Sequence, residues 1–279
     1  MVLLLTVLFG RWLQSVDGSP GISIPMLDVL QQKARSNPEI YHQVCLMIDA
    51  MAIKQQIQYC SKTDSHKGFV DLGNGSDEET VASEALVFMA VGLQGHWKAP
   101  IAYFFTKTLS PESQKVLVQH ALEALHDRGV RVVSLTMDGH ASNISMCSRL
   151  GCQLKVTDDL RAFFPHPATG QPVYVIMDAC HMLKLARNMF QVYSPLVSHD
   201  GVISWSIIKH LNEIQEEEGL RAANKITSNH IHYHNQKMKV SLAAQTLSRS
   251  VADALQFMKE SGHEDFQECH STVKFIKVI

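Results

Sequence analysis

The chain has 279 residues, of which 46% are hydrophobic and 19% are charged, and this composition excludes disordered, collagen-like and low-complexity proteins. At roughly 100–200 residues per domain, the length predicts two domains, or one domain with a large insertion. The 25 basic and 27 acidic side chains give a net charge of -2, which excludes a generally basic nucleic-acid-binding surface. Any contact with DNA therefore requires a local patch, another segment or a partner.

Two features of the sequence bear on its compartment. The six cysteines form no CxxC pair, and several lie in apolar runs, which indicates a reducing compartment. Residues 1–9 are apolar but lack the basic flank and the cleavage site of a signal peptide, and a bilayer span takes about 20 residues. We interpret them as the tail of a helix or an odd start of a shortened chain, with a secretory signal as the alternative. No membrane partner is expected.

The first predicted elements are a helix, a buried strand and a hairpin. Apolar residues at helical spacing predict a short amphipathic helix over residues 26–34. Residues 44–48 form a continuous apolar run that ends in Asp49, as is typical of a buried central strand with a carboxylate at its C-terminal end. The next strands are predicted over residues 67–72, 85–93 and 100–106, the last two as an antiparallel hairpin.

Helices and strands then alternate. Ser110 is a suitable N-cap, Pro111 takes the first helical position, and Gly129 ends that helix. Two further buried strands, over residues 130–137 and 173–177, are each followed by an aspartate. The remaining helices of this region are predicted over residues 141–150 and 181–192.

The order of these elements predicts an α/β fold with an RNase H-like mixed sheet and flanking helices, because three antiparallel-linked strands precede the parallel ones. A doubly wound α/β fold would need a helix between the first strands, and none is evident. Beyond residue 193 the sequence has no clear strand. Helical stretches over residues 205–217, 218–225 and 240–259 predict a second, mostly α-helical region.

Asp49 and Asp138 each follow a buried strand, and neighbouring strands would bring the two carboxylates together. Two like charges at close range favour bound cations, and hard oxygen ligands favour Mg²⁺ or Mn²⁺. A two-metal site activates a water or a 3′-hydroxyl in phosphodiester chemistry. The alternative is that each aspartate only caps the turn after its strand.

Asp178 follows the third such strand, and His181, Lys184 and Arg187 then recur at intervals of three, which places them on one helix face. The N-terminus of a helix offers free N–H groups to phosphate, Lys184 offers a charge, and Asp178 can hold a base edge or a cation. No glycine-rich P-loop precedes this helix. The alternative interpretation is a solvated polar stripe on an otherwise apolar helix.

Three histidines, His230, His232 and His234, alternate as in a strand, which would place three imidazoles on one face. Zinc is one interpretation, but no cysteine or carboxylate lies nearby to complete a known spacing, and structural zinc takes four ligands. Exposed histidines without a metal are the alternative.

Several segments in this order resemble the P-element-type DNA transposases of animals and their domesticated relatives that carry a THAP domain. The resemblance covers nearly everything after Gly10. Its segments are residues 12–21 (WLQSVDGSPG), 47–54 (MIDAMAIK), 95–105 (GHWKAPIAYFF), 136–139 (TMDG), 178–188 (DACHMLKLARN) and 237–248 (KMKVSLAAQTLS).

The resemblance implies an RNase H-like catalytic core interrupted by a helical GTP-binding insertion. Asp49 and Asp138 match the first two members of the family's acidic triad, and Asp178 and Lys184 match its guanine-nucleotide contacts. The implied domains are a remnant of an N-terminal helical region and linker, the N-terminal part of the catalytic core, and the insertion domain, over residues 1–40, 41–178 and 179–279.

By the same resemblance, the expected function is metal-dependent DNA cleavage and strand transfer, with Mg²⁺ or Mn²⁺ and with GTP as a bound cofactor. Full-length members of the family bind transposon-end DNA, and the resemblance implies a nuclear location and allows a homo-oligomer. The family's zinc-coordinating THAP module and the third catalytic carboxylate, a glutamate after the insertion, are not found in the sequence.

The sequence as written is therefore expected not to cleave or join DNA, because two carboxylates leave one metal ion under-coordinated. The carboxylates near the end of the chain lack the family's surrounding residues. One alternative is a domesticated, non-enzymatic protein that keeps the fold and associates with nucleotide or DNA. A GTP-hydrolysing switch is a further alternative, but no motif supplies its water-positioning and Mg²⁺-binding groups.

Overall fold

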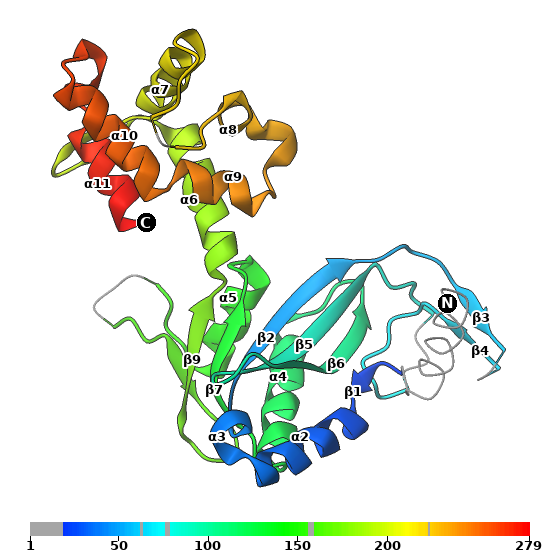
Figure 1. The fold of residues 1–279 in the computed structure, drawn as a ribbon. Helices are drawn as coiled ribbons and strands as arrows, with labels where there is room; N and C mark the ends of the chain where they lie inside the picture. Colours follow the sequence, from blue (N-terminus) through cyan, green and yellow to red (C-terminus); the bar gives the residue numbers. More distant parts are fainter. Residues whose placement is uncertain (1–18, 62–63, 76–78, 156–158, 223) are drawn as a thin grey trace, which may run out of the picture. The chain divides into compact units, whose positions relative to one another are not determined.

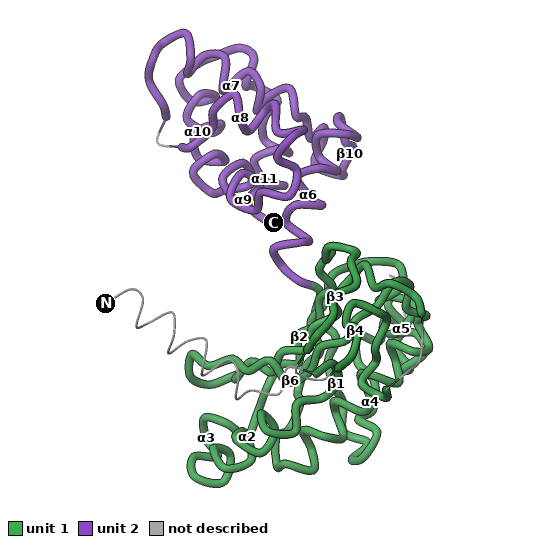
Figure 2. The backbone as a smooth tube through the Cα atoms, turned by 90° about the vertical axis from the view of Figure 1, so that its right-hand side faces the viewer, with its two compact units in different colours: residues 1–177 green, residues 178–279 purple. Residues whose placement is uncertain are grey.

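The computed structural model describes residues 19–61, 64–75, 79–155, 159–222 and 224–279, so the apolar residues 1–9 lie outside the described part. The chain divides into two compact units, residues 1–177 and 178–279, which are described separately (Figures 1 and 2). In the described part, no helix combines the length and the apolar character that a membrane span needs.

The first unit contains a seven-stranded mixed sheet with the strand order β1-β6-β5-β2-β7-β9-β8. Strand β2 pairs antiparallel with β5 and parallel with β7, and β7 continues parallel to β9. The hairpin of β5 and β6 and the parallel pairs β2–β7–β9 confirm the predicted mixed sheet. The strands are β1 (Gly21–Ile22), β2 (Gln43–Ala52), β5 (Glu84–Gly92), β6 (Lys98–Thr106), β7 (Arg131–Met137), β8 (Phe163–Pro165) and β9 (Pro172–Met177).

The helices of this unit contribute apolar side chains to one core with the sheet. The helices are α2 (Ile24–Ser36), α3 (Pro38–Tyr41), α4 (Pro111–His126) and α5 (Ala141–Leu150). In α4, the Ser110 hydroxyl accepts the backbone N–H of Ser113, so the predicted N-cap is confirmed. Leu27 and Leu30 of α2 belong to the same buried cluster as the central strands.

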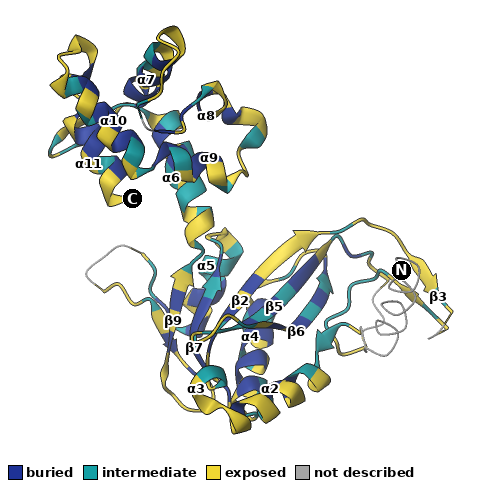
Figure 3. Cartoon of the chain, viewed as in Figure 1, coloured by how far each residue is buried: buried dark blue, intermediate teal, exposed yellow. Residues whose placement is uncertain are grey.

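Strand β2 buries one face more than the other, although its apolar run predicted a strand buried on both faces. Val44, Leu46 and Ile48 are buried, whereas Met47 between them is 38% exposed. Figure 3 shows the buried residues along the central strands and on α4. Burial alternates with the period of two that strand geometry imposes. One face of β2 is therefore buried and the other is partly exposed.

The strand predicted over residues 67–72 is not formed as such. A short ribbon, β3 (Gln58–Cys60) with β4 (Ser65–Lys67), ends where that strand was predicted to begin. Gly68 then adopts a φ of +113°, and a Cβ there would lie 2.2 Å from the Gln56 carbonyl oxygen. Because this backbone conformation interrupts a regular strand, residues 69 and 71 make only isolated bridges.

The second unit is mostly helical, as predicted, and has its own core around Phe190, Trp205 and Leu255. It also contains a hairpin of β10 (Leu196–Ser198) and β11 (Gly201–Ile203), which the sequence did not predict because three-residue strands are too short to show a period. The helices are α6 (Ala179–Tyr193), α7 (Trp205–Glu217), α8 (Ser228–Ile231), α9 (Val240–Thr246), α10 (Arg249–Glu260) and α11 (His270–Val278), with 3₁₀ turns over Tyr233–Gln236 and Glu264–Phe266.

Two helical predictions in this unit are corrected. Of the range predicted as a helix over residues 218–225, the described residues 218–222 and 224–225 form none, and the Gln215 side chain accepts the Ala222 backbone N–H at 3.0 Å in place of a helical bond. The stretch over residues 240–259 is two helices, α9 and α10. The Ser248 hydroxyl at their junction donates to the Gln245 carbonyl, a local bond that competes with continued helix.

Candidate functional site

The strand register places Asp49 and Asp138 at the same end of two neighbouring strands. In the parallel pair β2–β7, Met47 lies opposite Thr136. Two residues further along both strands, the same register places Asp49 beside Asp138. The Cys45 thiol and the Thr136 hydroxyl, 3.2 Å apart, mark a shared face just before this point.

A cavity of about 390 Å³ opens at this end of the sheet, and both carboxylates line it. Glu84 lines it too, since Glu84 begins β5 and pairs with Ala52 at the end of β2. The other polar residues of the wall are Lys107, Thr108, Gln114, His140, Ser142 and Asn143. Sequence reasoning missed Glu84 because its position depends on the pairing of β2 with β5.

Each of the two aspartates has one oxygen held by the protein. Asp138 Oδ1 accepts the His140 backbone N–H at 3.1 Å and the Asn143 side-chain amide at 2.6 Å. Asp49 Oδ1 accepts the Ala50 backbone N–H at 2.9 Å. In the described part of the chain, Oδ2 of each aspartate has no hydrogen-bond partner. The arrangement therefore presents fixed carboxylates with an oxygen available to a ligand.

The donor chemistry of this cavity fits a hard divalent cation such as Mg²⁺ or Mn²⁺, because the available ligands are carboxylate oxygens. Within the described ranges, no group of three His, Cys, Asp or Glu side chains is close enough to hold a metal ion. Two carboxylates alone would fill only part of the coordination sphere of such an ion. The hydrogen bonds from His140 and Asn143 also show that Asp138 Oδ1 caps the turn after its strand. The turn-capping interpretation therefore holds for this one oxygen.

Asp178 precedes α6 and Lys184 lies on it, both in the second unit. Asp178 is the N-cap, and its carboxylate accepts the backbone N–H groups of Cys180 and His181 at 3.2 and 3.0 Å. These two N–H groups are therefore not free for phosphate, contrary to the expectation for this helix start. The Lys184 side chain is half-buried and has no ion-pair partner within the described ranges.

Arg187 contradicts the interpretation of this helix face as a solvated polar stripe. The side chain is fully buried, with the guanidinium carbon 3.5 Å from the centre of the Tyr233 ring. It donates to the side-chain oxygen of Asn188 and to the carbonyl of Lys237, both at 2.9 Å. Burial lowers the pKa of the Arg187 guanidinium from its ordinary value. Arg187 is thus a packing residue of the unit.

The three histidines predicted to share a strand face are not brought together. Their segment forms α8 and a 3₁₀ turn, because Thr227 and His230 make a reciprocal capping box that starts a helix. His230 is buried and its second ring nitrogen lies 2.8 Å from Gln245 Oε1, whereas His232 and His234 are exposed. His230 is therefore a hydrogen-bonded core histidine.

Two family descriptions match the chain. Residues 18–151 match the TNP-like RNase H N-terminal domain, and residues 180–279 match the TNP-like GTP-binding insertion domain. The chain is 33% identical over 272 residues to human DNA transposase THAP9, a match that covers 96% of this chain and 30% of that protein. It therefore spans less than a third of the length of this curated relative.

A solved structure shares the fold. The Drosophila P element transposase in a strand transfer complex superimposes with a TM-score of 0.79 at 24% sequence identity, covering 98% of this chain and 56% of that one. Together with the family matches, this likeness confirms the predicted RNase H-like sheet followed by a helical region. The chain belongs to the P-element-type DNA transposase family and carries an RNase H-like N-terminal domain and a GTP-binding insertion domain.

Proposed function

We propose that this chain forms part of a metal-dependent DNA strand-transfer core in which Asp49 and Asp138 bind Mg²⁺ or Mn²⁺. The supporting observation is that the two carboxylates line one cavity, each with one oxygen held and the other without a partner in the described part. The human relative is named a DNA transposase, and the Drosophila relative was solved in a strand transfer complex.

In this mechanism the residues of the chain bind and orient. A divalent cation, when bound, supplies Lewis acidity that activates a water or 3′-hydroxyl and stabilises the leaving oxygen. Asp49 and Asp138 hold the cation, and the His140 N–H and the Asn143 amide fix the Asp138 carboxylate. Lys107, on the wall of the same cavity, provides a positive charge suited to a DNA phosphate.

Calorimetric titration with Mn²⁺ tests the metal assignment. We expect Asp49→Asn and Asp138→Asn each to abolish measurable binding, because each removes a charged ligand, while circular dichroism stays unchanged. Glu39→Gln on α3, an exposed carboxylate outside the cavity, is the matched control and should bind as the unsubstituted chain does. Loss of the fold together with binding would favour turn capping as the role of these aspartates.

We propose GTP as a cofactor of the second unit, with Asp178 reading the guanine edge and Lys184 contacting phosphate. Guanine presents N–H donors that a carboxylate accepts, whereas adenine leaves that carboxylate unpaired, so GTP should bind more tightly than ATP. Asp178→Asn keeps a good N-cap residue and therefore separates base reading from helix capping. Equal GTP and ATP affinity in calorimetry would remove Asp178 from this role, and unchanged GTP affinity in Lys184→Ala would remove Lys184.

The remaining assignments follow from the family. We propose residues 41–178 as the N-terminal part of the catalytic core and 179–279 as the insertion domain, with transposon-end DNA as the partner of the full-length protein, a nuclear location, and assembly with further copies. The segment before residue 41 contributes α2 to the core of the first unit.

We propose further that this chain alone does not cleave or join DNA, because Asp49 and Asp138 supply too few oxygens to fix two ions. Incubation with Mn²⁺ and transposon-end DNA tests this. Cleavage that disappears in both Asp49→Asn and Glu84→Gln would contradict the proposal and would assign Glu84 as the third ligand. A folded chain that binds GTP and DNA without cleavage would fit the non-enzymatic alternative.

A further inference from the structure

Gln114 on α4 carries an unusual buried atom at the wall of the candidate site. The residue is 8% exposed and lines the cavity, yet its Oε1 has no hydrogen-bond partner among the described residues. Buried polar atoms without partners are rare in folded proteins, and each one calls for an explanation. The explanation here lies at the other end of the same amide, where Nε2 donates to Asn143 Oδ1 at 3.1 Å.

The bond from Gln114 holds Asn143 in the orientation in which its NH₂ group faces the Asp138 carboxylate. Because Asn143 Oδ1 accepts from Gln114, Asn143 presents its NH₂ group to Asp138 Oδ1. Asp138 Oδ1 accepts two hydrogen bonds, and the one from Asn143, at 2.6 Å, is shorter than the one from the His140 backbone. A hydrogen bond to an ionised carboxylate is roughly twice as strong as one between neutral groups.

The charge of Asp138 dictates the direction of both amides. If Gln114 turned its oxygen toward Asn143, two acceptors would face each other, unless Asn143 turned as well and set its oxygen against the Asp138 carboxylate. Both outcomes are electrostatically unfavourable, so the chain of donors runs from Gln114 through Asn143 to Asp138. The unpaired Oε1 of Gln114 is the consequence of this polarity.

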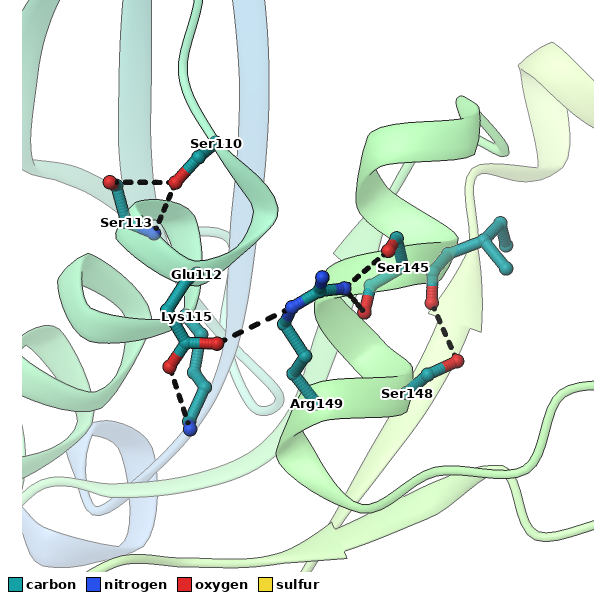
Figure 4. A network of polar contacts seen from close by, with 8 residues as sticks. Ser110, Glu112, Ser113, Lys115, Ser145, Ser148 and Arg149 are labelled. Carbon is teal, nitrogen blue, oxygen red and sulfur yellow. Dashed lines mark hydrogen bonds and ion pairs between the residues drawn. The ribbon is translucent and has the colours of Figure 1, made fainter.

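The two helices that carry the amides are also joined at the surface. The Glu112 carboxylate of α4 forms ion pairs with Arg149 of α5, at 3.3 Å, and with Lys115, at 3.0 Å. Figure 4 shows both contacts as dashed lines. Arg149 also donates to the hydroxyl and carbonyl of Ser145 one turn earlier. The α4–α5 contact therefore has an outer ion pair and an inner amide pair, of which only the amide pair reaches the cavity.

We propose that Gln114 and Asn143 are positioning residues that lock the Asp138 carboxylate, with Oδ1 held by the protein and Oδ2 presented to the metal. This inference rests on the proposed role of Asp138 as a metal ligand. Outer partners that orient a ligand typically change metal affinity by about 10–100-fold when they are removed. Asn143 acts on Asp138 directly, and Gln114 acts through Asn143.

A double-mutant cycle on Mn²⁺ affinity tests the inference, with the variants Asn143→Ala, Gln114→Leu and the two combined. Asn143→Ala should weaken binding about 10–100-fold. Gln114→Leu should also weaken it, and the double variant should bind like Asn143→Ala, because Gln114 has no effect once Asn143 is gone. Gln119→Leu on the same helix, half-exposed and outside the cavity, is the matched control.

The outcomes separate this inference from the proposed function. If the unsubstituted chain bound no Mn²⁺, both would be refuted, whereas binding that is unchanged in Asn143→Ala would refute the positioning role alone. Equal and additive losses of Mn²⁺ affinity in the two single variants would show independent structural effects. They would also overturn the inference that Gln114 acts through Asn143. Unfolding midpoints measured in parallel report any loss of stability apart from affinity.

A measurement on the metal-free, unsubstituted chain tests the same contact without any variant. With asparagine side chains labelled with ¹⁵N, the NMR signals of the Asn143 amide protons should exchange slowly with solvent, because the NH₂ group donates to Asp138 and the oxygen of the same side chain accepts from Gln114. Signals that exchange as fast as those of the exposed Asn74 would show that the amide is not held and would overturn the inference.

Discussion

Replacement of Arg187 tests how the second unit is held together. The guanidinium makes two hydrogen bonds from a charged donor, at about 1.5–3 kcal/mol each, and a desolvated cation–π contact of about 2 kcal/mol. Burying the charge costs several kcal/mol, which offsets most of this gain. Arg187→Met keeps the side-chain stem and removes the charge, so we expect a loss of only about 1–2 kcal/mol.

Arg187→Ala should destabilise the unit much more, because the side chain is fully buried and its removal leaves a cavity. Large-to-small core substitutions cost about 2–5 kcal/mol. Hydrogen exchange of the α6 amides measures both variants within the full chain, and each 1.4 kcal/mol should accelerate the slowest amides about tenfold. If the α6 amides exchanged as fast in Arg187→Met as in Arg187→Ala, the reasoning would be refuted. The polar contacts of Arg187 would then contribute more to stability than the volume of its side chain.

Two further predictions concern backbone and charge. Gly68→Ala should destabilise the first unit by more than about 1 kcal/mol in urea unfolding, because the φ of Gly68 is +113° and the new Cβ would meet the Gln56 carbonyl. Gly75→Ala, at a φ of +66° with open space around it, should lower the free energy of unfolding less. Equal losses of stability in the two variants would contradict the steric argument. The hydrogen bond from Lys274 lowers the pKa of Asp200, so its stabilisation is present above the ordinary value of 3.8 and is lost as pH falls through the lower folded value. Asp200→Asn should therefore lower the unfolding midpoint at neutral pH but not at low pH, and a difference that persists in acid would refute the assignment.

The predicted elements agree best with the structure where local signals mark both ends. Helix α5 begins and ends at the predicted residues, with His140 as its N-cap and Gly151 as its C-cap, and α7 matches its predicted range over 205–217. The strand predicted over 67–72 failed because Gly68 adopts a φ of +113° with the Gln56 carbonyl beside it, an arrangement that local propensity does not report.

The candidate site was predictable only in part. Asp49 and Asp138 stand out in the sequence because each follows an apolar strand, but Glu84 joins the cavity through long-range pairing of β2 with β5. The sequence does mark Gln114 as unusual, because it is a polar residue on the apolar face of α4, three and four residues before the buried Leu117 and Val118. Its bond to Asn143 depends on the packing of two helices, which no local pattern specifies.

The most direct test of the central claim is a crystal structure of the chain grown with Mn²⁺, with anomalous scattering used to locate the ion. The account predicts one anomalous peak in the cavity, within coordination distance of an oxygen of Asp49 and of Oδ2 of Asp138. The Asn143 amide should still be bonded to Oδ1. An ordered structure at saturating Mn²⁺ with no ion between these carboxylates, or with the two side chains turned apart, would contradict it.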